Sequence, residues 1–146
     1  MDNTATIAQA IYDYFNRSCP LLQGGRVGWD YLPADAGGYT IEMTPVATVI
    51  KEYVDGGSLR QCEFVIAGRE DYGRDVLQNL DNSGFYEKLA DWLEQQTAAG
   101  NLPVLPDRLT AQSLESLSSA YILQEGTDNA RYQIQCRLVY TRPAVF

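Results

Sequence analysis

Three carboxylates on one expected helix are the residues whose spacing comes nearest to acid–base chemistry. Glu87, Asp91 and Glu94 stand at i, i+4 and i+7, so they share one flank of that helix. Neighbouring carboxylates can act as general acid and base, but such a row is also typical of a solvated helix face. Glu70-Asp71 precedes the helical pattern, where acids interact favourably with the positive end of the helix dipole. We expect none of these acids to be catalytic.

The chain has no histidine, which removes the commonest general base and the commonest metal ligand. Ser-His-Asp and Cys-His centres therefore cannot be built from this chain alone. Cys19, Cys62 and Cys136 are odd in number and lack metal-type spacing, so we expect three small buried hydrophobic side chains. The glycine pairs lead into no phosphate-binding motif and are expected to form turns. We therefore predict no enzyme activity, no catalytic residue, no metal site and no cofactor.

Length and charge narrow the class of protein further. The 146 residues fit a single domain, 1–146, with one ordinary core. A net charge of -8 and a pI of about 4.4 disfavour a protein that grips phosphate backbones over a wide face. No apolar run is long enough for a membrane span and no basic-then-apolar leader is present, so we expect a cytoplasmic protein.

The most regular element of the sequence is a long strand. Apolar and polar residues alternate without a fault from Ala130 to Thr141, and successive strand side chains point to opposite faces. The inward set is Ala130, Tyr132, Ile134, Cys136, Leu138 and Tyr140. The outward set includes Arg131, Gln133, Gln135 and Arg137, with no acid, thiol or imidazole among them. This outward face is suited to holding a partner rather than to catalysis.

Further segments have β character. Tyr39 to Thr44 alternates and is expected to be a strand. Val49 to Val54 and Ser58 to Ala67 flank Asp55-Gly56-Gly57, whose residues supply the positive φ angles of a tight hairpin turn. Leu102 to Thr110 is expected to be a linker that leads to a less regular strand, Leu114 to Gln124.

Helical periodicity occurs in two regions. The first has Asn3 or Thr4 as its cap, an apolar face that includes Ile11 and Phe15, and an end before Pro20. The second begins at Asp71 and ends at Gly100. In it Val76, Leu77 and Leu80 form one short apolar piece, and Phe85, Leu89, Trp92 and Leu93 form a stronger one. Asn82-Ser83-Gly84 lies between them, which leaves one helix or a helix pair open.

This order predicts an α+β fold with two layers. We expect a mostly antiparallel sheet of about four to five strands, with the two helical regions packed on one face. Leu21 to Gly38 is expected to be a long irregular stretch that carries the aromatic pair Trp29 and Tyr31. Loops of such length in a compact domain tend to be functional or partly disordered, so this one is a candidate to become ordered on assembly.

Three runs of sequence resemble one family of virion proteins. They are Tyr53-Val54-Asp55-Gly56-Gly57-Ser58, Asn82-Ser83-Gly84-Phe85-Tyr86-Glu87-Lys88 and Ala130-Arg131-Tyr132-Gln133-Ile134-Gln135-Cys136-Arg137-Leu138. Together they resemble the small minor capsid proteins of tailed phages and prophages of Gram-positive bacteria, a family similar to tail terminators. The likeness covers most of the chain, from the first helix to the last strand.

The resemblance implies a structural protein that assembles as a hexameric ring on a finished tail tube, stops its growth and offers a surface to the head connector. The implied partners are further copies of this chain, the tail tube protein and the head–tail connector protein, with no specific nucleic-acid binding and no membrane. The implied location is the virion, after synthesis in the host cytoplasm. A closed ring needs two different patches on each subunit, and our candidate interface residues are Arg131, Gln133, Gln135, Arg137, Trp29 and Tyr31.

Other functions remain open at this point. A head-side neck or connector protein, or a minor capsid subunit, would use the same kind of assembly. A small enzyme such as an acyltransferase would need a base that the missing histidine makes hard to supply. A DNA-binding module is disfavoured by the acidic charge.

Overall fold

Two long antiparallel strands form the centre of the molecule. The computed structural model describes residues 6–22, 26–34, 36–125 and 128–144. In it, β4 (Ser58–Asp71) pairs with β7 (Asn129–Arg142) along the full length of both strands, from Ser58 opposite Arg142 to Asp71 opposite Asn129. The strand expected from Ala130 to Thr141 is thereby confirmed.

Shorter strands flank this central pair on both sides. They are β1 (Arg26–Trp29), β2 (Gly38–Thr44), β3 (Val49–Glu52), β5 (Thr110–Ser116) and β6 (Tyr121–Glu125). The order is β1-β2-β4-β7-β5, while β3 also pairs with β4 and β6 with β7. β1 lies parallel to β2, and the other described pairs are antiparallel. β2 and β3 thus share one side of β4, and β5 and β6 share the far side of β7.

Alternation along β7 separates a core face from an outer face. All six residues of the predicted inward set are buried. In the middle of the ladder they pair with apolar residues of β4, such as Phe64 opposite Cys136 and Ile66 opposite Ile134. The other face carries the polar set, as period-two patterning requires.

The first helix, α1 (Ile7–Ser18), begins at an N-cap that the sequence pattern did not select. The Thr6 hydroxyl accepts a hydrogen bond from the Gln9 amide at 3.1 Å, so Thr6 is the N-cap; the predicted caps Asn3 and Thr4 lie outside the described residues. The helix ends at Ser18 and a short 3-10 turn η1 (Pro20–Leu22) follows, which confirms the expected end before Pro20. Its buried residues include Ile11 and Phe15.

The second helix, α2 (Val76–Ala99), is continuous through Asn82-Ser83-Gly84, so the helix pair did not form. Its N-cap is Asp75, whose carboxylate accepts hydrogen bonds from the amides of Leu77 and Gln78. It ends at Gly100, whose φ of 77° is the left-handed conformation that glycine adopts most easily. No helix of the described residues is long and apolar enough to cross a membrane.

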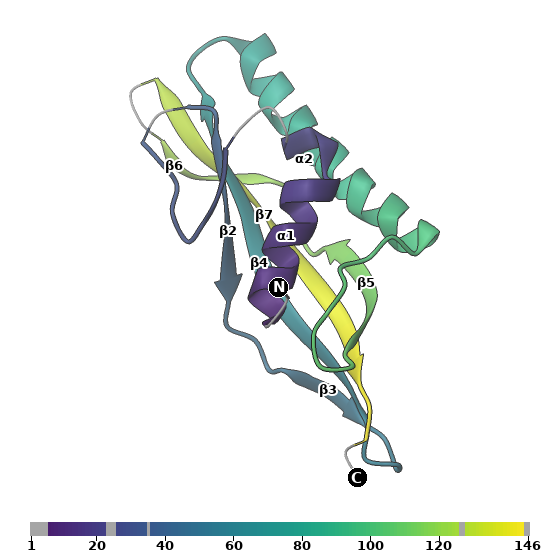
Figure 1. Cartoon of the computed structure of the whole chain (residues 1–146). Coiled ribbons are helices and arrows are strands. Elements are labelled where there is room, and N and C mark those ends of the chain that lie inside the picture. Colours follow the sequence, from purple (N-terminus) through teal and green to yellow (C-terminus); the bar gives the residue numbers. More distant parts are fainter. Residues whose placement is uncertain (1–5, 23–25, 35, 126–127, 145–146) are drawn as a thin grey trace.

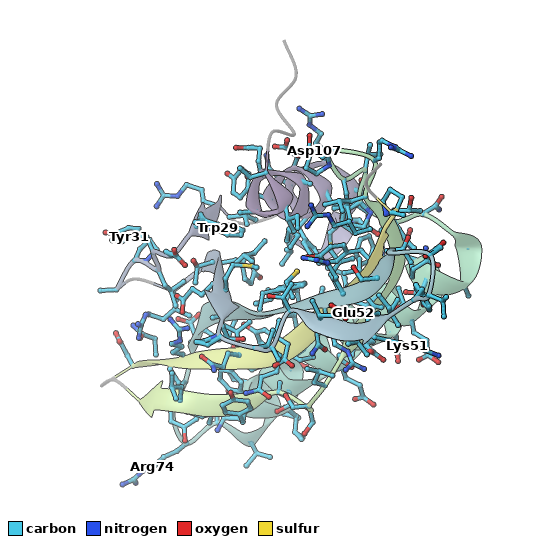
Figure 2. All side chains as sticks on the ribbon, turned by 90° about the horizontal axis from the view of Figure 1, so that it is seen from below. Trp29, Tyr31, Lys51, Glu52, Arg74 and Asp107 are labelled. Carbon is cyan, nitrogen blue, oxygen red and sulfur yellow. The ribbon has the colours of Figure 1, made fainter. Side chains whose placement is uncertain are left out.

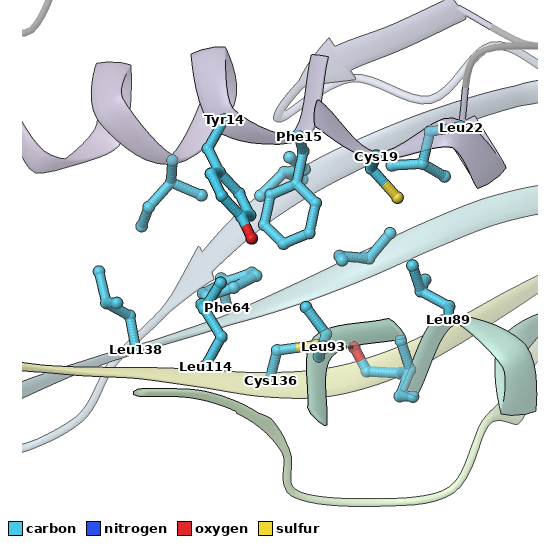
Figure 3. Packing of buried hydrophobic residues seen from close by; sticks show 14 of the residues in the cluster. Tyr14, Phe15, Cys19, Leu22, Phe64, Leu89, Leu93, Leu114, Cys136 and Leu138 are labelled. Atoms are coloured by element: carbon cyan, nitrogen blue, oxygen red, sulfur yellow. Dashed lines mark hydrogen bonds between the residues drawn. The ribbon is translucent and has the colours of Figure 1, made fainter. Parts of the chain in front are cut away.

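Both helices lie on one face of the sheet, and the core lies between the two layers (Figure 1). Figure 3 shows Tyr14 and Phe15 directed from α1 toward the sheet residues Phe64, Leu114 and Leu138. The rings of Phe15 and Phe64 are 5.8 Å apart, centroid to centroid, and Trp92 of α2 lies 6.1 Å from Phe15. These aromatic contacts join α1, α2 and β4 into one core.

The fold class is confirmed as α+β with a mostly antiparallel sheet, but the expected four to five strands were too few. The described residues form seven strands. One additional strand is β1, which lies within the stretch 21–38 that was expected to be irregular. The other comes from the single segment expected at Leu114 to Gln124, because bends at 117–118 divide it into β5, which begins at Thr110, and β6.

The start of the second helical region was also placed too early. Glu70 and Asp71 are the last residues of β4 and do not open the helix, so their expected interaction with the helix dipole is wrong. They pair with Ala130 and Asn129 of β7. The cross-strand ladder extends β4 beyond Ala67 into residues whose polarity indicates a loop when the chain is considered locally.

Candidate assembly surfaces

The outward side chains of β7 lie on the sheet face opposite the helices. Gln133, Gln135 and Arg137 stand opposite Ala67, Val65 and Glu63 of β4, and Arg131 stands opposite Arg69. Four of the six predicted interface residues therefore share one surface, which we call the outer row: Arg131, Gln133, Gln135 and Arg137.

Arg131 forms an ion pair that crosses a strand. Its two terminal nitrogens donate to the two carboxylate oxygens of Glu42 on β2, at 2.8 and 3.1 Å, while its Nε donates to Gln133 at 3.1 Å. β4 lies between these two strands in the sheet. The side chains of Arg131 and Glu42 are 12% and 28% exposed. A bidentate pair of this kind is both strong and specific in geometry.

The Arg131–Glu42 pair explains why two residues on the outer face of β4 are buried although no helix covers them. Val65 and Ala67 belong to the outer face of β4, yet they are only 4% and 0% exposed. They stand opposite Gln135 and Gln133 in the ladder, and opposite Glu42 and Thr40 on the β2 side. The long polar side chains of β2 and β7 therefore lie over β4 and shield its small apolar residues from water.

The remainder of the outer row is also engaged within the chain. Gln133 donates to the hydroxyl of Tyr121 at 2.7 Å. Arg137 donates through Nε to Glu115 at 2.6 Å and through a terminal nitrogen to Gln61 at 3.3 Å. Gln135 is the exposed member, with a weaker contact to Tyr121 at 3.4 Å. Most hydrogen-bonding capacity of the row is thus satisfied internally, and its charges are neutralised by Glu42 and Glu115.

Trp29 and Tyr31 do not lie on the outer row. Trp29 stands opposite Ile41 in the β1–β2 ladder and packs edge to face against Tyr12 of α1, with ring centroids 6.4 Å apart. It therefore belongs to the helical side of the sheet. Tyr31 follows β1 and is 70% exposed, and Figure 2 shows it at the margin of the molecule. The structure therefore does not bring the six predicted residues together on one surface.

The three carboxylates considered above are exposed, and the three thiols are buried or half-buried. Glu87, Asp91 and Glu94 are exposed on α2, and within the described ranges no group of three or more histidine, cysteine or acidic residues is arranged to hold a metal ion. Burial raises the pKa of the Cys62 thiol to about 12 and raises the pKa of the Cys19 and Cys136 thiols as well. Thiols in this state stay protonated at neutral pH and are poor nucleophiles.

Two exposed apolar patches were not recognised as surfaces from the sequence. The hairpin patch is formed by Ile50, Tyr53 and Val54, which are 45%, 41% and 109% exposed. The helix patch is formed by Val76, Leu77 and Leu80, which are 67%, 74% and 61% exposed. These residues form the short apolar piece that helical spacing predicted, and in the structure they are exposed. Helical spacing predicted the apolar stripe, but it could not show whether another part of the protein covers that stripe.

The two patches lie at opposite ends of β4. The hairpin patch is next to Ser58, where β4 begins, and the helix patch follows Asp71, where β4 ends. A strand of this length spans roughly 40 Å. Figure 1 shows β3 at one end of the molecule and the start of α2 at the other. The chain therefore presents two dissimilar apolar surfaces at opposite ends of β4.

No model of a protein family matches the chain, and a search of curated proteins finds no match either.

Proposed function

We propose that this chain is a non-enzymatic virion protein that closes the end of a phage tail tube as a ring and joins it to the head connector. The observation that carries the proposal is the pair of apolar patches at opposite ends of β4. The resemblance of the three sequence runs to minor capsid and tail-terminator proteins supplies the context.

Dissimilar patches favour a ring over a two-fold dimer. In a two-fold dimer the same surface meets itself, whereas a ring requires one patch of each subunit to meet a different patch of the next. The hairpin patch is a strand turn and the helix patch is the first turns of a helix. Exposed apolar clusters of this kind on a small protein mark interaction surfaces.

The outer row has a different role in the proposed assembly. Because its charges are paired within the chain, the outer row forms a surface whose arginine side chains are held in place and whose charges are neutralised. Gln135 and Tyr31, which stay exposed, are available for contacts with the tube or a neighbour. The net charge of -8 would make a ring of these subunits repel DNA and let the genome pass without adhesion.

The test uses one variant in each patch. Purified Val54→Asp and Leu77→Asp proteins are added separately to tail tubes that lack a terminator, and the tubes are imaged by electron microscopy. Each variant should fail to cap the tubes, because each ring contact needs one hairpin patch and one helix patch. Val104→Asp is the matched control, since Val104 is 78% exposed but lies in neither patch.

Mixing the two variants makes the test specific for head-to-tail contacts. Val54→Asp retains its helix patch and Leu77→Asp retains its hairpin patch, so the mixture should form pairs that cannot extend, detectable by native mass spectrometry. Capping by both single variants at the wild-type level would contradict the proposal. Copurification with DNA-filled heads instead of tails would support the head-side connector in its place.

A further inference from the structure

A hollow beside the start of α1 is lined by three arginines. Its volume is about 410 Å³, and its lining includes Arg60, Arg108, Arg142, Tyr140, Asp107 and Ile7. The protein as a whole is acidic, with 19 acidic against 11 basic residues. A local concentration of guanidinium groups in such a chain therefore calls for a physical explanation.

The strand register brings two of these arginines together. Arg60 stands opposite Tyr140, and Ser58 stands opposite Arg142, so all four residues lie on the helical face at one end of the β4–β7 ladder. Burial raises the pKa of the Tyr140 hydroxyl, and the charges of Arg60 and Arg142 act in the opposite direction. Both guanidinium groups are therefore close enough to Tyr140 to influence its ionisation.

Arg60 is held in place without being neutralised. Its Nε donates to the hydroxyl of Ser58 at 2.9 Å, and Ser58 is buried. This contact fixes the side chain and leaves its terminal nitrogens available. The ion pairs among the described residues involve Arg131 and Arg137, so no carboxylate of those residues lies within 4.0 Å of the three arginines of the hollow.

The third arginine comes from a loop with an unusual backbone. Asp107 and Arg108 have φ angles of 56° and 66°, in the left-handed region that non-glycine residues rarely adopt. The amide of Leu109 closes this turn on the carbonyl of Pro106 at 3.0 Å. Consecutive residues in this conformation occur where the surrounding structure holds them. Here the turn places Arg108 at the hollow, together with Asp107, which offsets one of the three positive charges.

We propose that this hollow binds an oxyanion, a carboxylate or a phosphate group, between Arg60, Arg108 and Arg142. Guanidinium forks match the planar oxygens of such groups. The adjacent N-terminal end of α1 contributes the positive end of a helix dipole. The hollow is small and the remainder of the protein is acidic, which selects a single anionic group over an extended polyanion such as DNA. This site goes beyond ring assembly and can be measured on the free protein.

The test is titration of the full chain with inorganic phosphate and, separately, with citrate, followed by amide chemical shifts in NMR. We expect a dissociation constant on the order of 1 mM for at least one of the two. The shifts should concentrate at residues 107–109 and 140–144. Arg142→Gln and Arg108→Gln should each weaken binding at least tenfold, to about 10 mM or more.

Arg74→Gln is the matched control, because it removes the same charge at an exposed site. Figure 2 shows Arg74 and Asp107 on opposite sides of the molecule. Binding by Arg74→Gln should equal that of the wild type, and thermal unfolding would establish that all variants are folded. Preference for citrate would identify the ligand group as a carboxylate, and preference for phosphate would identify it as a phosphate.

Three results would overturn the proposal. The first is that neither anion binds saturably, and the second is equal binding by Arg142→Gln and the wild type. The third is tighter binding of duplex DNA than of phosphate, with the steep salt dependence of a polyanion interaction, since that would make the hollow part of a nucleic-acid surface.

Discussion

The hydroxyl of Tyr86 is an unfavourable polar group in the core. Its side chain is 0% exposed, and its oxygen has no hydrogen-bond partner among the described residues. The ring stacks on Tyr132 with centroids 5.8 Å apart. A Cβ added at Gly68 would lie 2.3 Å from the hydroxyl oxygen, so only glycine fits beneath it. The packing is thus determined by the ring, while the hydroxyl contributes a desolvation cost.

We predict that Tyr86→Phe does not destabilise the protein and raises the free energy of unfolding by about 1 kcal/mol, because an unpaired buried polar group is removed. Tyr14→Phe is the contrasting variant. The Tyr14 hydroxyl donates to the Asn101 carbonyl at 2.6 Å, and its loss should cost about 1 kcal/mol. Urea unfolding measures both, and a larger loss from Tyr86→Phe than from Tyr14→Phe would contradict the prediction.

Glu70 lies near Tyr86 and makes the stability of the fold depend on pH. Burial, with a smaller effect from Asp71, raises the pKa of Glu70 above its ordinary value of 4.5, and its charge raises the pKa of Tyr86 and Tyr39. A folded-state pKa above the unfolded value means that folding favours the protonated carboxyl. The contribution of the protonated Glu70 carboxyl to the free energy of unfolding is complete below pH 4.5. It is lost as the pH rises through the folded-state pKa.

We therefore predict that Glu70→Gln becomes more stable relative to the wild type as the pH is raised from about 4 to 7. Thermal unfolding at a series of pH values measures this difference. Glu87→Gln, which changes an exposed acid on α2, should show a smaller trend. Parallel pH profiles for wild type and Glu70→Gln would show that the carboxyl carries no such effect.

At the scale of elements, β2, β4 and β7 are joined by side chains as well as by backbone hydrogen bonds. The Arg131–Glu42 pair bridges β7 and β2 across β4, and the Arg137–Glu115 pair connects β7 with β5. The first pair is the more buried, with side-chain exposures of 12% and 28% against 33% and 42%. The two pairs should therefore differ in their effect on stability.

Glu42→Gln should lower the free energy of unfolding by about 1 to 3 kcal/mol, because it leaves the guanidinium of Arg131 partly buried without a counter-charge. Glu115→Gln, at the more exposed pair, should cost less than about 1 kcal/mol. Urea unfolding of both variants gives the comparison. A loss at Glu115 equal to or larger than that at Glu42 would mean that burial does not set the strength of these pairs.

For the whole molecule, the sequence predicted most elements but not their full extent. Regular patterns sufficed for β7, α1 and the hairpin of β3 and β4, because each has local periodicity or a turn that sets it. β1 was missed because Val27 and Trp29 alternate for only a few residues among glycines, and its pairing with β2 is parallel and nonlocal. The extension of β4 to Asp71 depends on β7, which lies far away in the sequence.

The candidate surfaces were only partly predictable for the same reason. Alternation placed the outer row on one face, but the partners Glu42 and Glu115 come from other strands, so the internal pairing was not visible. Leu77 and Leu80 have the spacing of a core stripe, yet they are exposed. The first turns of α2 extend beyond the part of the protein that buries its later turns. The arginine hollow combines residues of β4, β7 and a loop that only the fold brings together.

The β4–β7 ladder also determines when this protein can fold. Every residue of its central pair finds its partner on a strand from a distant part of the chain, from Asp71 with Asn129 to Ser58 with Arg142. Loop-closure entropy must be overcome before these contacts stabilise anything, and folds dominated by such pairings form in roughly milliseconds to seconds. During synthesis β4 stays unpaired with β7 until β7 has left the ribosome. The nascent chain thus exposes the unpaired edge of β4 while the residues between β4 and β7 are made.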